Sequence, residues 1–117
     1  MLKINEIYTS IQGESSHTGL PCVFIRLTGC NLRCSWCDTA YAFYKGNDLT
    51  VEEVMTKVDS FSLPLVEVTG GEPLMQEDVY PLMDALLEKG YKVMLETGGA
   101  LPIDKVPEKV IKILDIK

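Results

Sequence analysis

Short apolar segments alternate with stretches of helical periodicity, and this alternation constrains the fold of the 117-residue chain more than any other feature. Segments rich in β-branched and aromatic residues predict strands at 4–10, 22–28, 65–69, 91–96 and 110–115. Apolar residues recurring every three or four positions predict helices at 50–58 and 76–89. A strand–helix–strand order implies parallel pairing through right-handed crossovers. We therefore expect an α/β fold of parallel strands joined by crossover helices.

Both predicted helices carry end signals. Thr50, with Glu53 three residues later, fits a capping box at the start of the first helix. Gly90 directly follows the second helix and suits its C-terminal cap. The chain from 29 to about 47 is expected to form a loop, and Pro107 is expected to start a short helical turn.

Small and polar residues follow four of the predicted strands. In βα architectures, sites form where the carboxyl ends of parallel strands meet. We therefore expect one composite site from the groups at these strand ends, which lie at 29–30, 69–72, 96–98 and 115.

Three cysteines of the predicted loop are spaced C-x3-C-x2-C. Cys30, Cys34 and Cys37 can converge on one centre only if the backbone wraps around it. A structural zinc site would need a fourth ligand, for which Cys22 and His17 are the candidates. Cys22 lies at the opposite end of a predicted core strand, so we expect it to be a small core residue. The other interpretation is an iron–sulfur cluster with three thiolates and one open iron, which the spacing favours.

The charge balance excludes some functions. Lys and Arg number 11 and Asp and Glu number 17, which gives a formal net charge of −6. Non-specific nucleic-acid binding needs a basic surface, so we expect no nucleic-acid partner. No apolar run is long enough for a membrane span, and the first residues lack the apolar stretch of a signal peptide. We expect a cytoplasmic protein with reduced thiols.

Two motifs give the sequence a family resemblance. The cysteine spacing, with Trp36 directly before Cys37, resembles the signature of the radical S-adenosylmethionine (SAM) superfamily. The sequence Gly70-Gly71-Glu72-Pro73 after a predicted strand is similar to its GGEP motif. The resemblance implies a partial (βα) barrel of parallel strands, with residues 1–117 as a single radical SAM core domain. Later barrel strands are absent, so we expect the N-terminal part of a C-terminally incomplete barrel.

Further segments make the resemblance more specific, because they are similar to 7-carboxy-7-deazaguanine synthases within this superfamily. It is carried by the segments 7–15, 19–21, 24–27 and 37–39. That family implies a carbon–nitrogen lyase of queuosine and deazapurine biosynthesis. It would convert 6-carboxy-5,6,7,8-tetrahydropterin to 7-carboxy-7-deazaguanine through a 5′-deoxyadenosyl radical, by ring contraction with loss of ammonia. The implied cofactors are a [4Fe-4S] cluster, SAM and Mg²⁺.

The resemblance also implies roles for individual residues. The cluster would be ligated by Cys30, Cys34 and Cys37. Mg²⁺ would be bound by Thr39. SAM would be contacted by Trp36, Asp38, Gly71, Glu72, Glu96 and Asp115. The substrate would be contacted by Ile11, Gln12, Gly13, Glu14, Arg26 and Thr69.

The resemblance implies partners as well. These are a flavodoxin or ferredoxin as electron donor and a second copy of the chain in a homodimer. One departure concerns Asp115-Ile116-Lys117, which falls where many members of the family have Ser-Pro-Lys. This departure weakens the SAM role of Asp115.

Two other functions remain open from the residues alone. A radical SAM activating enzyme for a glycyl-radical protein also has a small core, and it would act on a protein substrate. A non-catalytic cysteine-cluster module would bind zinc and would not cleave SAM. The polar residues Gln12, Glu14 and Arg26 favour the synthase over the activating enzyme.

Overall fold

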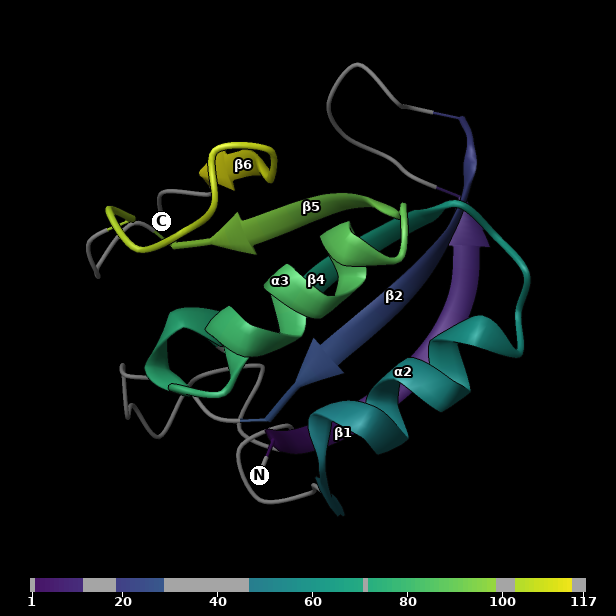
Figure 1. Ribbon diagram of the computed structural model, residues 1–117, viewed down its shortest axis with the longest axis horizontal. Coiled ribbons are helices and arrows are strands. Elements are labelled where there is room, and N and C mark those ends of the chain that lie inside the picture. Colours follow the sequence, from purple (N-terminus) through teal and green to yellow (C-terminus); the bar gives the residue numbers. More distant parts are fainter. Residues whose placement is uncertain (1, 12–18, 29–46, 71, 99–102, 115–117) are drawn as a thin grey trace, which may run out of the picture.

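The structure is a computed structural model, and it describes residues 2–11, 19–28, 47–70, 72–98 and 103–114. Within these residues, six strands form one sheet in the order β3-β1-β2-β4-β5-β6 (Figure 1). The strands are β1 (Leu2–Ile11), β2 (Pro21–Leu27), β3 (Asn47–Leu49), β4 (Leu65–Gly70), β5 (Lys92–Thr97) and β6 (Ile111–Leu114).

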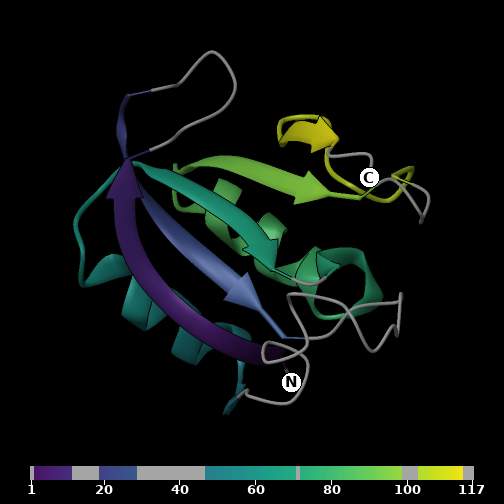
Figure 2. The same ribbon diagram turned by 180° about the vertical axis from the view of Figure 1, so that it is seen from behind.

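The four strands β2, β4, β5 and β6 pair in parallel, as the alternating pattern predicts. Ile25 of β2 lies opposite Val68 of β4, and Val68 lies opposite Leu95 of β5. Because these strands run in the same direction, their carboxyl ends meet at one edge of the sheet (Figure 2). This edge is where the strand-end residues were expected to gather.

The first predicted helix is confirmed as α2 (Val51–Asp59). Its capping box is complete: the Glu53 amide donates to Thr50 Oγ1 at 3.1 Å, and the Thr50 amide donates to Glu53 Oε1 at 2.9 Å. Val54, Met55 and Val58 form its buried face. Helix α2 therefore begins where local side-chain chemistry places it.

The second predicted helix is confirmed as α3 (Val79–Glu88), with a later start. A 3-10 turn, η1 (Pro73–Met75), comes first, and α3 begins three residues later than predicted. Gly90 has a φ of +91°, the left-handed conformation expected at a helix C-terminus. The predicted end of the helix is thus confirmed, and its start is displaced by the GGEP turn.

The strand–helix–strand pattern begins at the second predicted strand, so it leaves the direction of the N-terminal strand open. Strand β1 pairs antiparallel with both β2 and β3, so the sheet is mixed. A parallel crossover needs a dozen or more residues, usually with a helix. The segment between Ile11 and Pro21 is shorter than that, and it can return the chain only as an antiparallel neighbour.

Two local features lie near the cysteine loop and the C-terminus. Strand β3, which was not predicted, begins where the predicted loop ends and extends the sheet beyond β1. At Pro107 the chain makes a single turn, as expected, which is closed by the Val110 amide donating to the Pro107 carbonyl at 3.0 Å and does not continue as a helix.

The sheet has two different faces. Helices α2 and α3 cover one face (Figure 1), and the main core lies between them and alternate strand residues such as Val23, Ile25 and Val68. The opposite face, which we call the second face, carries no helix among the described residues (Figure 2). Its apolar members are Cys22, Phe24, Leu65, Met94, Ile111 and Ile113.

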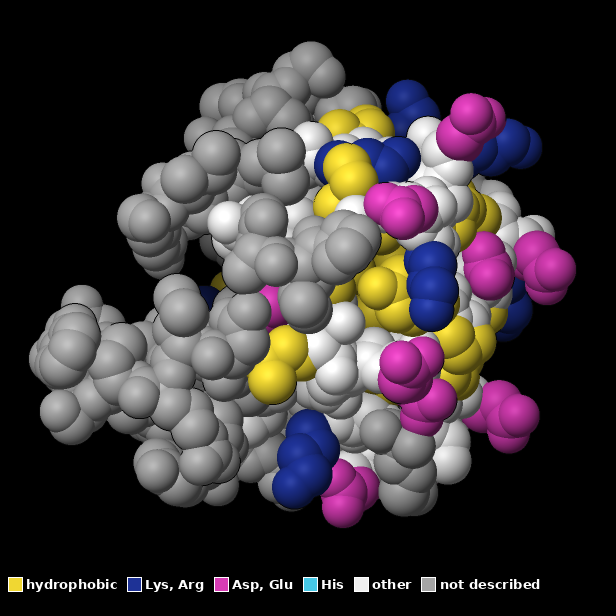
Figure 3. Space-filling view, turned by 90° about the vertical axis from the view of Figure 1, so that its left-hand side faces the viewer, with side chains coloured by type: hydrophobic (Ala, Val, Ile, Leu, Met, Phe, Trp, Pro, Cys, Tyr) yellow, Lys and Arg dark blue, Asp and Glu magenta, His cyan; other side chains and the backbone are white. Residues whose placement is uncertain are grey.

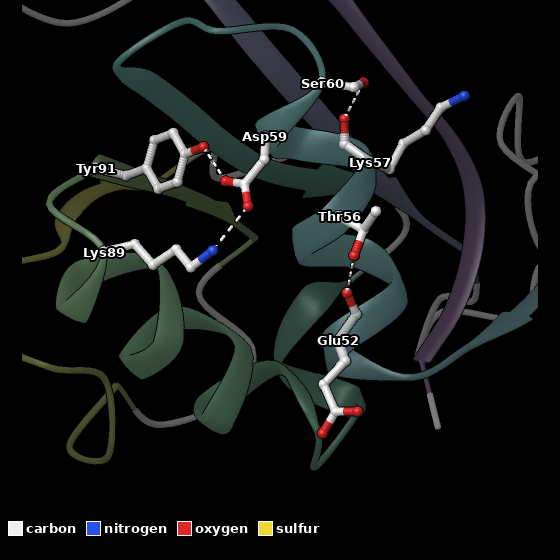
Figure 4. Close-up of polar contacts among 7 residues, drawn as sticks. All are labelled: Glu52, Thr56, Lys57, Asp59, Ser60, Lys89 and Tyr91. Atoms are coloured by element: carbon white, nitrogen blue, oxygen red, sulfur yellow. Dashed lines mark hydrogen bonds and ion pairs between the residues drawn. The ribbon is translucent and has the colours of Figure 1, made fainter.

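A polar cluster fixes the C-terminal end of α2 (Figure 4), which lies at the opposite side of the sheet from the strand carboxyl ends. Asp59 accepts hydrogen bonds from the Tyr91 hydroxyl and from Lys89 Nζ, the latter at 2.8 Å. The hydrogen bond to Asp59 raises the pKa of Tyr91 to about 12, and burial adds to the effect. The cluster joins α2 to the residues that lead into β5.

None of the helices in the described ranges combines the length and hydropathy that crossing a bilayer requires.

Candidate functional site

Three polar side chains form a row near the carboxyl ends of the central strands. Arg26 on β2 lies opposite Thr69 on β4, and the Thr69 hydroxyl donates to Glu96 Oε2 on β5 at 2.8 Å. Side chains alternate between the faces of a strand, and their neighbours Ile25, Val68 and Leu95 pack under the helices. The row therefore lies on the second face, and it joins two residues predicted for the substrate with one predicted for SAM.

Figure 3 shows the molecule from the side toward which these strand ends point. Over the described part of this side, acidic and basic side chains are interspersed, with apolar side chains between them.

Arg26 is held by groups of the neighbouring strand β1. Its Nη2 donates to the Tyr8 hydroxyl at 2.9 Å, and its Nη1 lies 3.2 Å from Glu6 Oε1. The Arg26 side chain keeps 30% of its surface exposed. A partly exposed guanidinium fixed on a sheet face suits a carboxylate ligand, because its planar fork matches two carboxylate oxygens.

Glu72 is buried, with 3% of its surface exposed, and its carboxylate is used within the protein. The Thr97 hydroxyl lies 2.9 Å from Oε1 and 2.8 Å from Oε2. The Gly98 amide donates to Oε1 at 2.9 Å, and the Leu74 amide donates to Oε2 at 3.1 Å. Glu72 thus connects the turn after β4 to the end of β5.

The glycine before this turn is required by the sheet itself. Gly70 has a φ of +123°, and a Cβ at this position would lie 2.3 Å from the Leu27 carbonyl oxygen. The close approach of the β2 and β4 backbones therefore requires a glycine here, whether or not a ligand binds nearby.

Gln76 links the GGEP turn to the residue before the cysteine loop. Its Nε2 donates to the Thr28 carbonyl at 2.9 Å and to the Lys3 carbonyl at 3.1 Å, while its Oε1 accepts from the Lys3 amide at 2.8 Å. The Thr28 amide in turn donates to the Lys3 carbonyl at 2.9 Å. The end of β2, two residues before Cys30, is therefore held against both β1 and the turn.

Cys22 is a core residue, as predicted. It is fully buried on the second face and contacts the cluster of Leu65 and Met94. Burial raises the pKa of its thiol to about 12, and the nearby Glu67 carboxylate adds to this effect. Because the thiolate is the metal-binding form, such a thiol is a poor ligand.

Ile11 does not join the row. It ends the antiparallel strand β1 and lies opposite Pro21, at the start of β2, whereas Glu6 lies opposite Arg26. Five residues of strand, roughly 17 Å, separate these two registers. The Ile11 side chain is 58% exposed.

The remaining predicted site residues lie outside the described residues. They are Gln12, Gly13, Glu14, Cys30, Cys34, Trp36, Cys37, Asp38, Thr39, Gly71 and Asp115.

Several residues that the sequence analysis did not assign to the site contact it, and three of them bind it through uncharged side chains. Tyr8 binds Arg26, Thr97 binds Glu72, and Gln76 binds the end of β2. Thr97 could have been predicted from the sequence, because it lies in the polar strand end at 96–98. Nothing in the local sequence distinguishes Tyr8 or Gln76, since their partners come from other strands.

Within the described ranges, no group of three or more His, Cys, Asp or Glu side chains could hold a metal ion. The donor set for a metal centre is therefore sought in the three cysteines at 30, 34 and 37, which the sequence spaces for an iron–sulfur cluster. Three thiolates leave one iron without a protein ligand, which fits a cluster that also binds a cofactor.

The mostly parallel α/β sheet, its polar strand ends and the spaced cysteines define a protein of the radical SAM type. The family model described as the Radical SAM superfamily matches residues 24–116. The chain therefore belongs to the radical SAM superfamily, whose members use a [4Fe-4S] cluster and SAM.

Within this superfamily the chain is similar to 7-carboxy-7-deazaguanine synthases. It is 51% identical over 118 residues to that of Koribacter versatilis (strain Ellin345), a match covering 99% of the chain and 52% of the relative. It is 52% identical over 116 residues to that of Chlorobaculum tepidum, covering 99% and 53%. The chain thus spans about half the length of these curated relatives.

A solved structure gives the same result for the fold. The crystal structure of QueE from Escherichia coli superposes with a TM-score of 0.86 at 28% sequence identity. The match covers 99% of this chain and 60% of that chain. Among the residues that the structure describes the sheet is not closed, and it corresponds to a partial barrel of the radical SAM type.

Proposed function

We propose that the protein containing this chain converts 6-carboxy-5,6,7,8-tetrahydropterin to 7-carboxy-7-deazaguanine in queuosine or deazapurine biosynthesis. The observation that carries the proposal is the 51 and 52% identity, over 99% of the chain, to proteins named as synthases of that product. The row formed by Arg26, Thr69 and Glu96 supports it, because a cation and hydrogen-bonding groups lie together at one edge of the sheet.

For the cofactors, we propose that Cys30, Cys34 and Cys37 hold the cluster. A cluster and SAM together supply radical chemistry, which breaks bonds that acid–base groups cannot. Glu96 is suited to SAM because its carboxylate can accept hydrogen bonds from hydroxyl and ammonium groups. The further SAM contacts proposed are Trp36, Asp38, Gly71, Glu72 and Asp115.

We expect Glu72 to act on this site mainly by fixing the conformation of the turn after β4, rather than by binding SAM through its carboxylate. Both of its carboxylate oxygens already accept hydrogen bonds from the protein. It therefore fixes the turn that follows β4, and it presents the backbone of that turn to the cofactor.

For the substrate, we propose that Arg26 binds its carboxylate and that Thr69, opposite Arg26 on β4, also contacts it. Arg26 offers the planar, permanently charged donor that a carboxylate requires. The further substrate contacts proposed are Ile11, Gln12, Gly13 and Glu14, and Mg²⁺ is proposed at Thr39 with substrate oxygens completing its shell.

The proposal includes the partners and the compartment. We expect a flavodoxin or ferredoxin as electron donor, a homodimer as the assembly, and the reducing cytoplasm as the location. Cross-linking and sedimentation of the full-length protein test the dimer, and reduction of the cluster by each candidate donor tests the partner.

The deciding experiment is an anaerobic assay of the full-length, reconstituted protein with SAM, dithionite, Mg²⁺ and the carboxytetrahydropterin. Formation of carboxydeazaguanine is expected, with none from the Cys34→Ala variant. A glycyl radical on an added protein substrate would instead indicate an activating enzyme. Bound zinc without SAM cleavage would indicate a metal-binding module.

A further inference from the structure

Tyr8 stands beside Arg26 on the second face, and two neighbours fix its ring. Tyr8 lies opposite Phe24 in the antiparallel pair of β1 and β2. The two rings are stacked, with centroids 5.3 Å apart and an angle of 12° between their planes. The stack fixes the Tyr8 ring, so its hydroxyl points to a defined place near the carboxyl end of β2.

The Arg26 guanidinium occupies that place. Its Nη2 donates to the Tyr8 hydroxyl at 2.9 Å, and its Cζ lies 5.4 Å from the centroid of the Tyr8 ring. Phe24, Tyr8 and Arg26 thus form a continuous series in which each side chain limits the freedom of the next. An arginine that is already oriented loses less conformational entropy when it binds a carboxylate in two-point geometry.

The second contact of the guanidinium is an exposed ion pair with Glu6. Glu6 lies 3.2 Å from Nη1, and 49% of its side-chain surface is exposed, against 30% for Arg26. An exposed ion pair of this kind contributes little, because solvent screens it. The Glu6 carboxylate also offsets part of the positive charge of Arg26, whereas the uncharged Tyr8 hydroxyl accepts a hydrogen bond without doing so.

We propose that Tyr8 is a positioning residue that aims the Arg26 guanidinium at the carboxylate of the ligand. The inference rests on the proposed function, in which Arg26 recognises that carboxylate. Tyr8 acts through Arg26, so its effect is confined to ligands that carry a carboxylate. Tyr8 is thereby a determinant of specificity for carboxylated over uncarboxylated pterins.

The test compares two ligands on the full-length protein. Binding of pterin-6-carboxylate and of pterin without the carboxylate is measured through pterin fluorescence, for the wild type and for Tyr8→Phe. This substitution removes only the hydroxyl and keeps the stacked ring. The preference for the carboxylated ligand is expected to fall about threefold to tenfold, the loss of one hydrogen bond, with little change for the uncarboxylated ligand.

Tyr91→Phe is the matched control. It also removes a tyrosine hydroxyl that is hydrogen-bonded, but at the opposite end of the strands, next to Asp59. It is expected to leave the ligand preference unchanged.

The outcomes separate this inference from the function on which it rests. If the wild type binds both ligands equally, or neither, the role of Arg26 and the proposed function fail. If the wild type prefers the carboxylated ligand and Tyr8→Phe keeps that preference, the role of Tyr8 is overturned. Equal loss of affinity for both ligands also overturns it, because it indicates a structural effect.

Discussion

The Thr97 hydroxyl lies within 2.9 Å of both carboxylate oxygens of Glu72, and this contact joins the end of β5 to the turn after β4. Both side chains are buried, with 2% and 3% of their surfaces exposed. A buried carboxylate is stable only when donors surround it. The geometry of the candidate site near these strand ends therefore depends on a pair of residues that hold two strands together.

Replacing Thr97 by Val tests this dependence. The variant keeps the shape of the side chain but leaves the Glu72 carboxylate with one donor fewer, which is expected to lower the free energy of unfolding by about 1–3 kcal/mol. Urea unfolding of the full-length protein measures the loss. Thr97→Ser retains the hydroxyl and should recover most of the stability, and a valine variant as stable as the wild type would contradict the argument.

Much of the parallel sheet was predictable because its signals are local. The capping box at Thr50 and Glu53 and the glycine after α3 act within a few residues, and the structure has both elements where these signals place them. The apolar strands were found within one or two residues of their observed ends for the same reason.

The rest of the site depends on contacts between distant residues. Tyr8 meets Arg26 across 18 positions, and Gln76 meets Lys3 across 73 positions. No local pattern encodes such pairs, because they exist only after the strands have aligned. The antiparallel direction of β1 also depends on contacts between distant residues. It places Ile11 at the opposite end of β2 from Arg26.

Gln76 allows a second test, of the contact that precedes the cysteine loop. Gln76→Ala removes two hydrogen bonds to backbone carbonyls and one from the Lys3 amide, and we expect a loss of about 1–2 kcal/mol in the free energy of unfolding. Gln76→Glu places a carboxylate against the carbonyls of Lys3 and Thr28 and should be the less stable variant at neutral pH. Urea unfolding gives the order, and a glutamate variant more stable than the alanine variant would refute it.

The two kinds of cysteine give a third test. Cys34→Ala should abolish binding of the iron–sulfur cluster, measured as iron content and visible absorbance after anaerobic reconstitution. Cys22→Ala should retain the cluster, because the Cys22 thiol is buried and its pKa is raised to about 12. Equal loss of iron in both variants would refute the assignment of Cys22 to the core.

The cluster of Asp59, Lys89 and Tyr91 gives the last test, which uses pH (Figure 4). Its hydrogen bonds lower the pKa of Asp59 below 3.8, so the contribution of Asp59 is complete above that value and is lost as pH falls through the lowered pKa. The contribution of Tyr91 to stability depends on pH in the opposite direction. Its pKa is raised from 10.0 to about 12, so its contribution is complete below pH 10 and is lost as pH rises towards 12.

Tyr91→Phe and the wild type should therefore differ in stability at neutral pH and converge at both extremes. Denaturant unfolding at closely spaced pH values measures this difference. The convergence above pH 10 is specific to the tyrosine hydroxyl, since the phenylalanine variant has no proton to lose there. A difference that stays constant from pH 9 to pH 12 would show that the ring, and not its hydrogen bond to Asp59, stabilises the end of α2.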